Sequence, residues 1–250
     1  MKTIRFEVYS ADAAPLRKAK RDFGGAVDKI DVIRIATRAG APRKPLRLAG
    51  DLAVMDTHGI WPSTLPKPHI LLRIGGAMAF GTGEHATTSA CLRFLRHEAA
   101  SLGCGWTMLD IGTGSGILAI AAEKLGAARV EAFDHDPRAV RAAQANVHRN
   151  RCTRVTVEAA DLLKWNPGRT RHPVVVANVF SEILRAAAPR IARTVAPGGC
   201  LVLSGILRAQ EQETVAAFVA LGLAEEQTTR RGKWVTVKLR QKPPRRRDVS

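Results

Sequence analysis

Three scarcities in the sequence each exclude a class of protein. The four cysteines lie far apart and form no Cys-x-x-Cys pair, so neither a zinc site nor a redox dithiol is indicated. Apolar runs such as ILAIAA and PVVVANVF are far shorter than the roughly 20 residues that span a bilayer, and the N-terminus MKTIRFEVYS lacks the apolar core of a signal peptide. We therefore expect reduced thiols, no bound metal, no membrane segment and a cytoplasmic location.

Acidic residues are scarce as well. The 22 Asp and Glu are outnumbered by 39 Lys and Arg, which gives a formal net charge of +17. Residues 230–250 alone contain nine Lys or Arg and one Asp, and we expect 241–250 to be a disordered basic tail. This excess either keeps the protein soluble or attracts RNA or a ribosomal partner. Aromatic residues make up only 5% of the chain and none lies in the terminal basic run, which disfavours a base-stacking surface there.

Strand and helix patterns alternate from about residue 106 onward. Apolar runs predict strands in WTMLDI, ARVEAFD, RVTVEA, PVVVANV and GCLVLSGI, with helical segments such as ILAIAAEKLG between them. Pro137 suits the first turn of a helix over PRAVRAAQANVHRN. This alternation predicts an α/β fold with a doubly wound, mostly parallel sheet, closed by an antiparallel hairpin of LAEEQTTRRG and KWVTVKLR.

Residues 1–70 indicate a smaller unit. KTIRFEVY, IDVIRIATR and DLAVMD predict strands, and residues 11–23 predict a short helix. Prolines and glycines in APRKPLRLAG and IWPSTLPKPH indicate turns and irregular connections. We therefore expect a small N-terminal α+β appendage over 1–70, the main domain over 71–240 and the basic tail after it.

A glycine-rich loop follows the first predicted strand of the main domain. Gly112, Gly114 and Gly116 have the spacing G-x-G-x-G in LDIGTGSGILAIAA. Glycine allows a sharp turn and lets a ligand approach where a Cβ would clash, and ligands of such sheets bind at the carboxyl ends of the strands. A nicotinamide-binding loop would more often have a further glycine where this chain has Ile117.

An aspartate at the end of the second strand has the position of a ribose ligand. Asp134 lies 20 residues after Gly114, where an acid can accept hydrogen bonds from both hydroxyls of a ribose. Either Asp134 or Asp136 could instead cap the helix that opens at Pro137. We expect Asp136 to cap this helix and Asp134 to bind ribose.

Three further polar residues follow strand ends. Asp110 ends the first strand, and Asp161 follows the third, where it either accepts a hydrogen bond from an adenine amino group or lies in a surface loop. Asn178 ends the fourth strand and could hold an amino group or orient a nucleophilic amine. An adenosine ligand without a pyrophosphate cradle, surrounded by acids, fits the cationic cofactor S-adenosylmethionine. The sequence NVFS lacks the prolines that often follow this asparagine in enzymes acting on adenine amino groups or glutamine amides, which argues against those substrates.

These stretches resemble one family. AFGTGEHATTS, LDIGTGSGILAIAA, VVVANV, LVLSGIL and KPLRLAGDLAVM are similar to sequences of the PrmA family of bacterial methyltransferases, which modify a protein of the large ribosomal subunit. The resemblance covers roughly residues 28–240. It implies a seven-stranded methyltransferase sheet, S-adenosylmethionine as cofactor, and methyl transfer to a Lys side chain or N-terminal amine of a ribosomal protein. It also implies cofactor contacts by Thr88, Gly112, Asp134 and Asn178.

The loop before Thr88 is implied by the resemblance to pack over the cofactor. Its predicted cofactor residues are Phe80, Gly81, Thr82 and Gly83. Asn178 and His85 are the candidate catalytic residues, although His85 could instead make a structural hydrogen bond. Thr87 and Thr88 could also cap the helix in TSACLRFL.

The chain departs from the family pattern in three places. Ala86 stands where the family usually has proline, and NVFSEIL stands where it usually has a sequence like NILAxPL. Few residues precede the matching segment, whereas family members carry a complete small domain that grips the ribosomal substrate. The alternatives are an RNA methyltransferase, which the basic tail favours, a methyltransferase of another protein or a small molecule, and a noncatalytic cofactor-binding protein.

Overall fold

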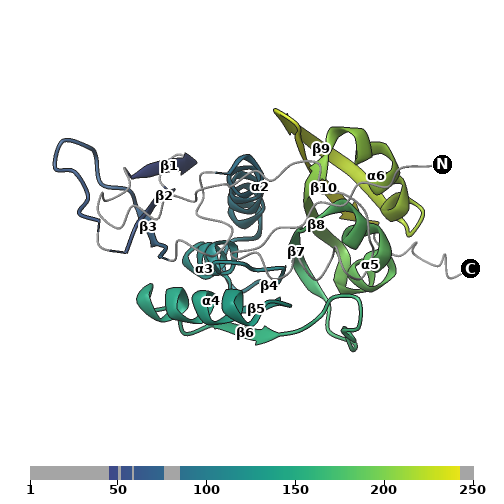
Figure 1. Ribbon diagram of the computed structural model, residues 1–250, viewed down its shortest axis with the longest axis horizontal. Coiled ribbons are helices and arrows are strands. Elements are labelled where there is room, and N and C mark those ends of the chain that lie inside the picture. Colours follow the sequence, from purple (N-terminus) through teal and green to yellow (C-terminus); the bar gives the residue numbers. More distant parts are fainter. Residues whose placement is uncertain (1–44, 50–51, 58, 76–84, 243–250) are drawn as a thin grey trace, which may run out of the picture. The chain divides into compact units, whose positions relative to one another are not determined.

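The computed structural model describes residues 45–49, 52–57, 59–75 and 85–242, and Figure 1 shows their arrangement. These residues belong to one of the two compact units into which the chain divides. The strands and helix predicted within 1–44 lie outside the described residues, as do the loop residues 80–83 and the predicted tail beyond 242.

The main sheet contains seven strands. They are β4 (Thr107–Ile111), β5 (Arg129–Asp134), β6 (Val155–Ala159), β7 (His172–Asn178), β8 (Val195–Leu207), β9 (Leu223–Arg231) and β10 (Trp234–Gln241). Their order is β6-β5-β4-β7-β8-β10-β9 (Figure 1). Neighbouring strands from β6 to β8 are parallel, whereas β10 is antiparallel to both β8 and β9. The predicted doubly wound, mostly parallel sheet with its closing hairpin is confirmed.

Helices cover both faces of this sheet. They are α2 (Ala86–Leu102), α3 (Ile117–Lys124), α4 (Pro137–Arg149), α5 (Ser181–Thr194) and α6 (Glu211–Val219), with a short 3₁₀ turn, η1 (Arg208–Gln210). Buried side chains of α2, α3 and α4 pack against one face, and those of α5 and α6 pack against the other (Figure 1). None of the described helices is both long and apolar enough to cross a bilayer.

The central strands are apolar on both faces, as the sequence pattern predicts. In β4, Met108 packs with α2 and α3, and the next residue, Leu109, packs with α5. Val174 and Val175 of β7 divide between the two cores in the same way. Successive strand residues point to opposite faces, so continuous apolar runs require helices on both sides of the sheet.

The start of α4 agrees with the sequence prediction. Pro137 is its first residue, and the side chain of Asp136 accepts a hydrogen bond from the Arg138 amide at 2.8 Å. A proline at this position loses no helical hydrogen bond, and the aspartate satisfies one of the free amides of the first turn. The predicted capping role of Asp136 is confirmed.

A second, three-stranded sheet comprises β1 (Leu46–Ala49), β2 (Leu52–Met55) and β3 (Ile70–Arg73). β2 confirms the strand predicted in DLAVMD. Hydrogen bonds from Asn146, within α4, and Asn150, just after it, attach β3 and the residues that follow it to the main domain. Asn150 accepts from the Arg73 amide and donates to the Arg73 carbonyl, both at 2.8 Å, and Asn146 makes the same pair of bonds with Gly75 at 3.0 and 3.1 Å.

A buried ion cluster joins α2 to the β9–β10 hairpin. Lys238 Nζ lies 2.9 Å from Glu98 Oε1 and 3.1 Å from Glu226 Oε2. Arg240 Nη2 lies 2.9 Å from the same Glu98 oxygen, and Arg240 Nε lies 2.8 Å from Glu226 Oε1. The side chains of Glu98 and Lys238 are only 4% and 7% exposed, so each charge depends on its partners for compensation.

Glu98→Gln is expected to lower the free energy of unfolding by about 3 kcal/mol, because the buried Lys238 and the half-buried Arg240 then share a single carboxylate. Urea unfolding followed by circular dichroism measures the change. Glu213→Gln is the matched control, since it removes the same charge from a side chain that is 71% exposed and pairs with Arg185 at 3.4 Å. That variant should lose less than about 1 kcal/mol, and equal losses in both would contradict the account.

The same cluster should make stability depend on acid pH. Hydrogen bonds from Arg240, then from Lys238, lower the pKa of Glu226 from 4.5 to about 2. Because the folded pKa lies below the unfolded one, this stabilisation is fully present above the ordinary carboxyl range and is lost as the pH falls towards the lower value. The urea midpoint of the wild type should therefore fall more steeply across this range than that of Glu226→Gln. Parallel pH profiles would rule the linkage out.

Candidate functional site

The carboxyl ends of three adjacent strands bring the predicted motifs together. β4 lies between β5 and β7, and Ile111 at its end pairs with residues of both neighbours. The residues at this edge are Gly112 after β4, Asp134 at the end of β5 and Asn178 at the end of β7. The glycine loop, the predicted ribose ligand and the predicted amide therefore meet where ligands of such sheets bind.

The glycine loop uses backbone conformations and close contacts that other residues would not tolerate. Gly112, Gly114 and Gly116 have φ angles of 69°, 56° and 80°, in the left-handed region that favours glycine. A Cβ on Gly112 would lie 2.3 Å from a methyl carbon of Val179, and one on Gly116 would lie 3.1 Å from the Cβ of Ala143. The first contact holds the loop against the chain that follows β7, and the second holds it against α4.

Asp134 is held in a fixed orientation by backbone amides. Its Oδ2 accepts a hydrogen bond from the Gly114 amide at 2.9 Å, and its Oδ1 accepts one from the Asp136 amide at 3.0 Å. His135 Nδ1 lies 3.4 Å from Oδ1. The residue is 8% exposed, and each carboxylate oxygen has a second lone pair. This carboxylate therefore keeps spare acceptor capacity, and its predicted role as a ribose ligand stays a prediction.

Asp110 is fully buried at the end of β4. Its Oδ2 accepts a hydrogen bond from the Thr113 hydroxyl at 2.7 Å, which ties the strand to the glycine loop. Burial raises the pKa of Asp110 to about 7, against the opposing hydrogen bonds from Thr113 and from the Ala119 amide. The nearby negative charge of Asp134 raises it further. Asp110 therefore titrates near neutral pH, and its predicted contact with the cofactor stays a prediction.

Asp161 lies in the loop after β6. Its Oδ1 accepts a hydrogen bond from the Leu163 amide at 3.0 Å, and its Oδ2 lies 3.8 Å from Lys164 Nζ. The Ala160 amide donates to the Asp134 carbonyl at 3.0 Å, which places this loop beside the end of β5. The exposed Asp161 thus has the local bonds of a surface loop and a position next to the predicted ribose site, so both interpretations stay open.

The start of α2 contains the predicted histidine and threonines. His85 is the residue before the helix, and its Nδ1 lies 3.4 Å from the Thr87 amide and 2.7 Å from the Thr87 hydroxyl. The cap is thus provided by His85 rather than by Thr87 or Thr88, and the structural hydrogen bond considered for His85 is present. Thr88 is fully buried, and its hydroxyl has no hydrogen-bond partner among the described residues.

Trp234, which no sequence motif indicates as a site residue, lies against His85. Their ring centroids are 5.2 Å apart in an edge-to-face arrangement. Burial, with a smaller effect of the Lys233 charge, lowers the pKa of His85, so its imidazole is neutral near pH 7. No local signal marks Trp234, because only the folded hairpin brings it to the start of α2.

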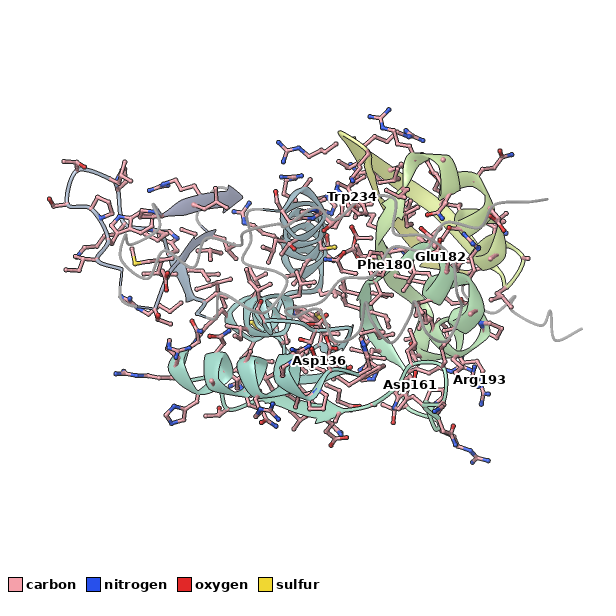
Figure 2. All side chains as sticks on the ribbon, in the orientation of Figure 1. Asp136, Asp161, Phe180, Glu182, Arg193 and Trp234 are labelled. Atoms are coloured by element: carbon pink, nitrogen blue, oxygen red, sulfur yellow. The ribbon has the colours of Figure 1, made fainter. Side chains whose placement is uncertain are left out.

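Two buried polar atoms at the junction of β7 and α5 also lack hydrogen-bond partners among the described residues. Asn178 Oδ1 and the Ser181 hydroxyl are buried and have no hydrogen-bond partner among the described residues. An unpaired buried polar atom costs about 1–3 kcal/mol, and a bound ligand can offset this cost. The intervening Phe180 is 69% exposed. In the view of Figure 2, Phe180 and Trp234 lie above Asp136 and Asp161.

The four cysteines show no catalytic or metal-binding arrangement. All are free, with Cys104 exposed and the other three buried. Burial raises the pKa of Cys91 and Cys200 to about 12 and that of Cys152 to about 11, so these thiols stay protonated and unreactive. Within the described ranges, no group of three or more His, Cys, Asp or Glu is placed to hold a metal ion.

Known proteins resemble the chain over most of its length. The family model described as "Ribosomal protein L11 methyltransferase (PrmA)" matches residues 28–242. A ribosomal protein L11 methyltransferase of Geobacter metallireducens is 42% identical over 193 residues, which make up 76% of this chain and 60% of that protein. That of Geotalea daltonii is 37% identical over 237 residues, which make up 89% of this chain and 74% of that protein.

A solved structure agrees with the fold. The crystal structure of ribosomal protein L11 methylase from Lactobacillus delbrueckii subsp. bulgaricus superposes with a TM-score of 0.71 at 27% identity, over 80% of this chain and 100% of that chain. The chain spans about three fifths of the length of its Geobacter relative. The resemblance to PrmA is confirmed: this chain belongs to the PrmA family, whose model carries the description of ribosomal protein L11 methyltransferases.

Proposed function

We propose that this chain is an S-adenosylmethionine-dependent methyltransferase that acts on an amine of a ribosomal protein, either a Lys side chain or an N-terminal amine. Its family supports this activity, since its relatives are named for ribosomal protein L11. The main structural support is the arrangement at the carboxyl ends of β5, β4 and β7, where the loop at Gly112 lies between Asp134 and Asn178. Its free thiols agree with a cytoplasmic location.

The polar groups at this edge fit S-adenosylmethionine. Asp134 would accept hydrogen bonds from the two ribose hydroxyls, and Asp161 would accept one from the adenine amino group. The buried Asn178 Oδ1 would accept one from the methionine amino group or from the incoming amine, and the buried Thr88 hydroxyl would bond to the cofactor. In each case a described atom with spare hydrogen-bonding capacity is matched to a group of the cofactor.

The charges at the site also suit a cationic cofactor. Asp110 titrates near neutral pH, so a nearby sulfonium would favour its carboxylate form. The glycine loop lets the backbone approach the ligand, and residues 80–83 are proposed to contribute to cofactor binding. A dinucleotide would bring its pyrophosphate against Asp110 and Asp134, which makes it a poor fit.

The chemistry is direct displacement. When bound, S-adenosylmethionine supplies a methyl group on a positively charged sulfur. The protein orients the amine in line with it, and Asn178 is the proposed orienting group. The amine must be neutral to attack, and burial beside Phe180 and Trp234 would lower its pKa. His85 is the candidate acceptor of the released proton, since its lowered pKa keeps the imidazole neutral.

RNA is the second candidate substrate. The net charge of +17 favours binding to a phosphate backbone, and the basic residues beyond β10 are the proposed contact. Family membership favours the protein substrate, because the related proteins are named for a ribosomal protein. A small-molecule substrate has no specific observation in its favour.

Asp134→Asn should weaken S-adenosylmethionine binding about 10-fold or more, because the side chain keeps its shape but loses an acceptor for a ribose hydroxyl. Isothermal titration calorimetry measures the affinity. Asp136→Asn is the matched control, since it removes the same charge two residues away and keeps a capping side chain. If Asp134→Asn bound S-adenosylmethionine as tightly as the wild type, or if the control lost as much affinity, Asp134 would not be the ribose ligand.

The substrate class is tested with ribosomes from cells that lack the enzyme. Incubation with methyl-labelled S-adenosylmethionine should label a band of ribosomal-protein size that protease removes and RNase does not. Asn178→Ala should reduce this labelling about 100-fold, as expected for loss of a group that orients or stabilises the reacting centre. If RNase removed the label and protease did not, the substrate would be RNA rather than a protein.

A further inference from the structure

Two guanidinium groups converge on one hydroxyl between α2 and the β9–β10 hairpin. Arg93 Nη1 lies 2.8 Å from the hydroxyl of Ser89, and Arg231 Nη1 lies 3.5 Å from the same oxygen. The two arginines come from segments far apart in sequence, so only the packing of the hairpin against α2 creates the pair. Like charges held this close repel each other, and the pKa of Arg93 is lowered by its burial and by the charge of Arg231.

This repulsion has no internal compensation in the described part of the chain. Neither Arg93 nor Arg231 forms an ion pair there, although their neighbours do. Arg230, beside Arg231 on β9, pairs with Glu211, and Glu98, farther along α2, is held by the buried ion cluster. Among the described residues, the carboxylates of Glu98 and Glu211 are therefore already paired, whereas Arg93 and Arg231 have no ion-pair partner.

The hydrogen-bond donors of this pair suit a planar anion. A serine hydroxyl has two lone pairs and one proton. When both guanidiniums donate to Ser89 Oγ, its proton is available to a third group. Ser89 is 7% exposed, so it is fixed in position, and each guanidinium keeps further N–H groups. Guanidinium forks match the two oxygens of a carboxylate, and such charge-assisted bonds are stronger than neutral ones.

Arg93, Arg231 and Ser89 lie next to residues of the candidate functional site at the start of α2 and in the β9–β10 hairpin. Ser89 follows Thr88, whose buried hydroxyl is a proposed cofactor contact, and is one helical turn from His85. Arg231 pairs across the hairpin with Trp234, whose ring lies against His85. The anion site and the predicted methyl-transfer edge thus share the start of α2 and the tip of one hairpin.

We propose that Arg93, Arg231 and Ser89 form a carboxylate-binding subsite that holds an acidic side chain of the protein substrate while its neighbouring amine is methylated. The inference rests on the proposed function and adds to it a feature of the substrate: an Asp or Glu close to the methylated amine. Three convergent donors select a single carboxylate, and its charge would relieve the repulsion between the two arginines.

An acidic protein segment fits this subsite better than RNA. Base recognition in single strands relies on an open aromatic face, but the Trp234 ring is contacted by the His85 ring and lies 5.3 Å from Lys233 Nζ. A backbone-binding surface also needs a row of free cations, and Arg230, the next cation along β9, is already paired. The half-buried Arg93 and the exposed Arg231 meet at one hydroxyl, which suits a single anionic group better than a continuous phosphate backbone.

The test uses steady-state methylation of the purified ribosomal protein by the full chain. Arg93→Gln and Arg231→Gln should each raise KM for that protein about 10-fold, as loss of a hydrogen bond to a charged group implies. Their kcat and their affinity for S-adenosylmethionine should stay within about twofold of wild type, since neither residue is part of the proposed reaction centre. Arg230→Gln, which removes the same charge one residue away, should leave KM unchanged.

Variants of the substrate identify which acidic residue binds to Arg93, Arg231 and Ser89. In peptides that contain the methylated amine, each Asp or Glu is changed in turn to Asn or Gln. One such change should raise KM for the wild type about 10-fold and have no effect on the Arg93→Gln, Arg231→Gln double variant, because both sides of one interaction are then removed.

The outcomes separate this inference from the proposed function. A wild type that methylates no ribosomal protein would overturn the proposed function and the subsite with it. An active wild type whose KM is unaffected by either arginine variant would overturn the subsite alone. The subsite would also be refuted if the variants lost affinity for a single-stranded RNA oligonucleotide while their KM for the protein stayed unchanged.

Discussion

The parallel pairing of β4 with β5 and β7 is the constraint on which the rest of the site depends. Parallel strands present their carboxyl ends at one edge, so this pairing sets the Gly112 loop, Asp134 and Asn178 in a row. The loop keeps its place because Gly112 fits closely against Val179 and because the Gly114 amide donates to Asp134. Because helices cover both faces of the apolar strands, the polar groups of the site lie in the loops at the ends of these strands.

Local sequence patterns predict the parts of this structure that depend on local physics. The apolar runs give the strands, and Asp136 with Pro137 gives the start of α4, since capping and proline geometry involve only neighbouring residues. The G-x-G-x-G loop and Asp134 are likewise predicted together, because the spacing across one strand–helix–strand unit fixes their proximity.

Features that depend on distant packing are not predicted in this way. His85 caps α2, although histidine is an uncommon cap, and Trp234 lies beside it only because the hairpin folds back onto α2. The complete burial of Asp110, and hence its raised pKa, follows from the helices packed over β4 rather than from its neighbours in sequence. Composition does not show which cations are paired. Lys238 and Arg240 form ion pairs within the fold, whereas Arg93 and Arg231 form none with the residues that the structure describes.

A crystal structure of the full chain with S-adenosylhomocysteine would locate the cofactor directly. We expect both ribose hydroxyls within hydrogen-bonding distance of Asp134, with the amino-acid end beside Asn178 and the Thr88 hydroxyl. A ligand bound away from the glycine loop, or a ribose that makes no bond to Asp134, would contradict it.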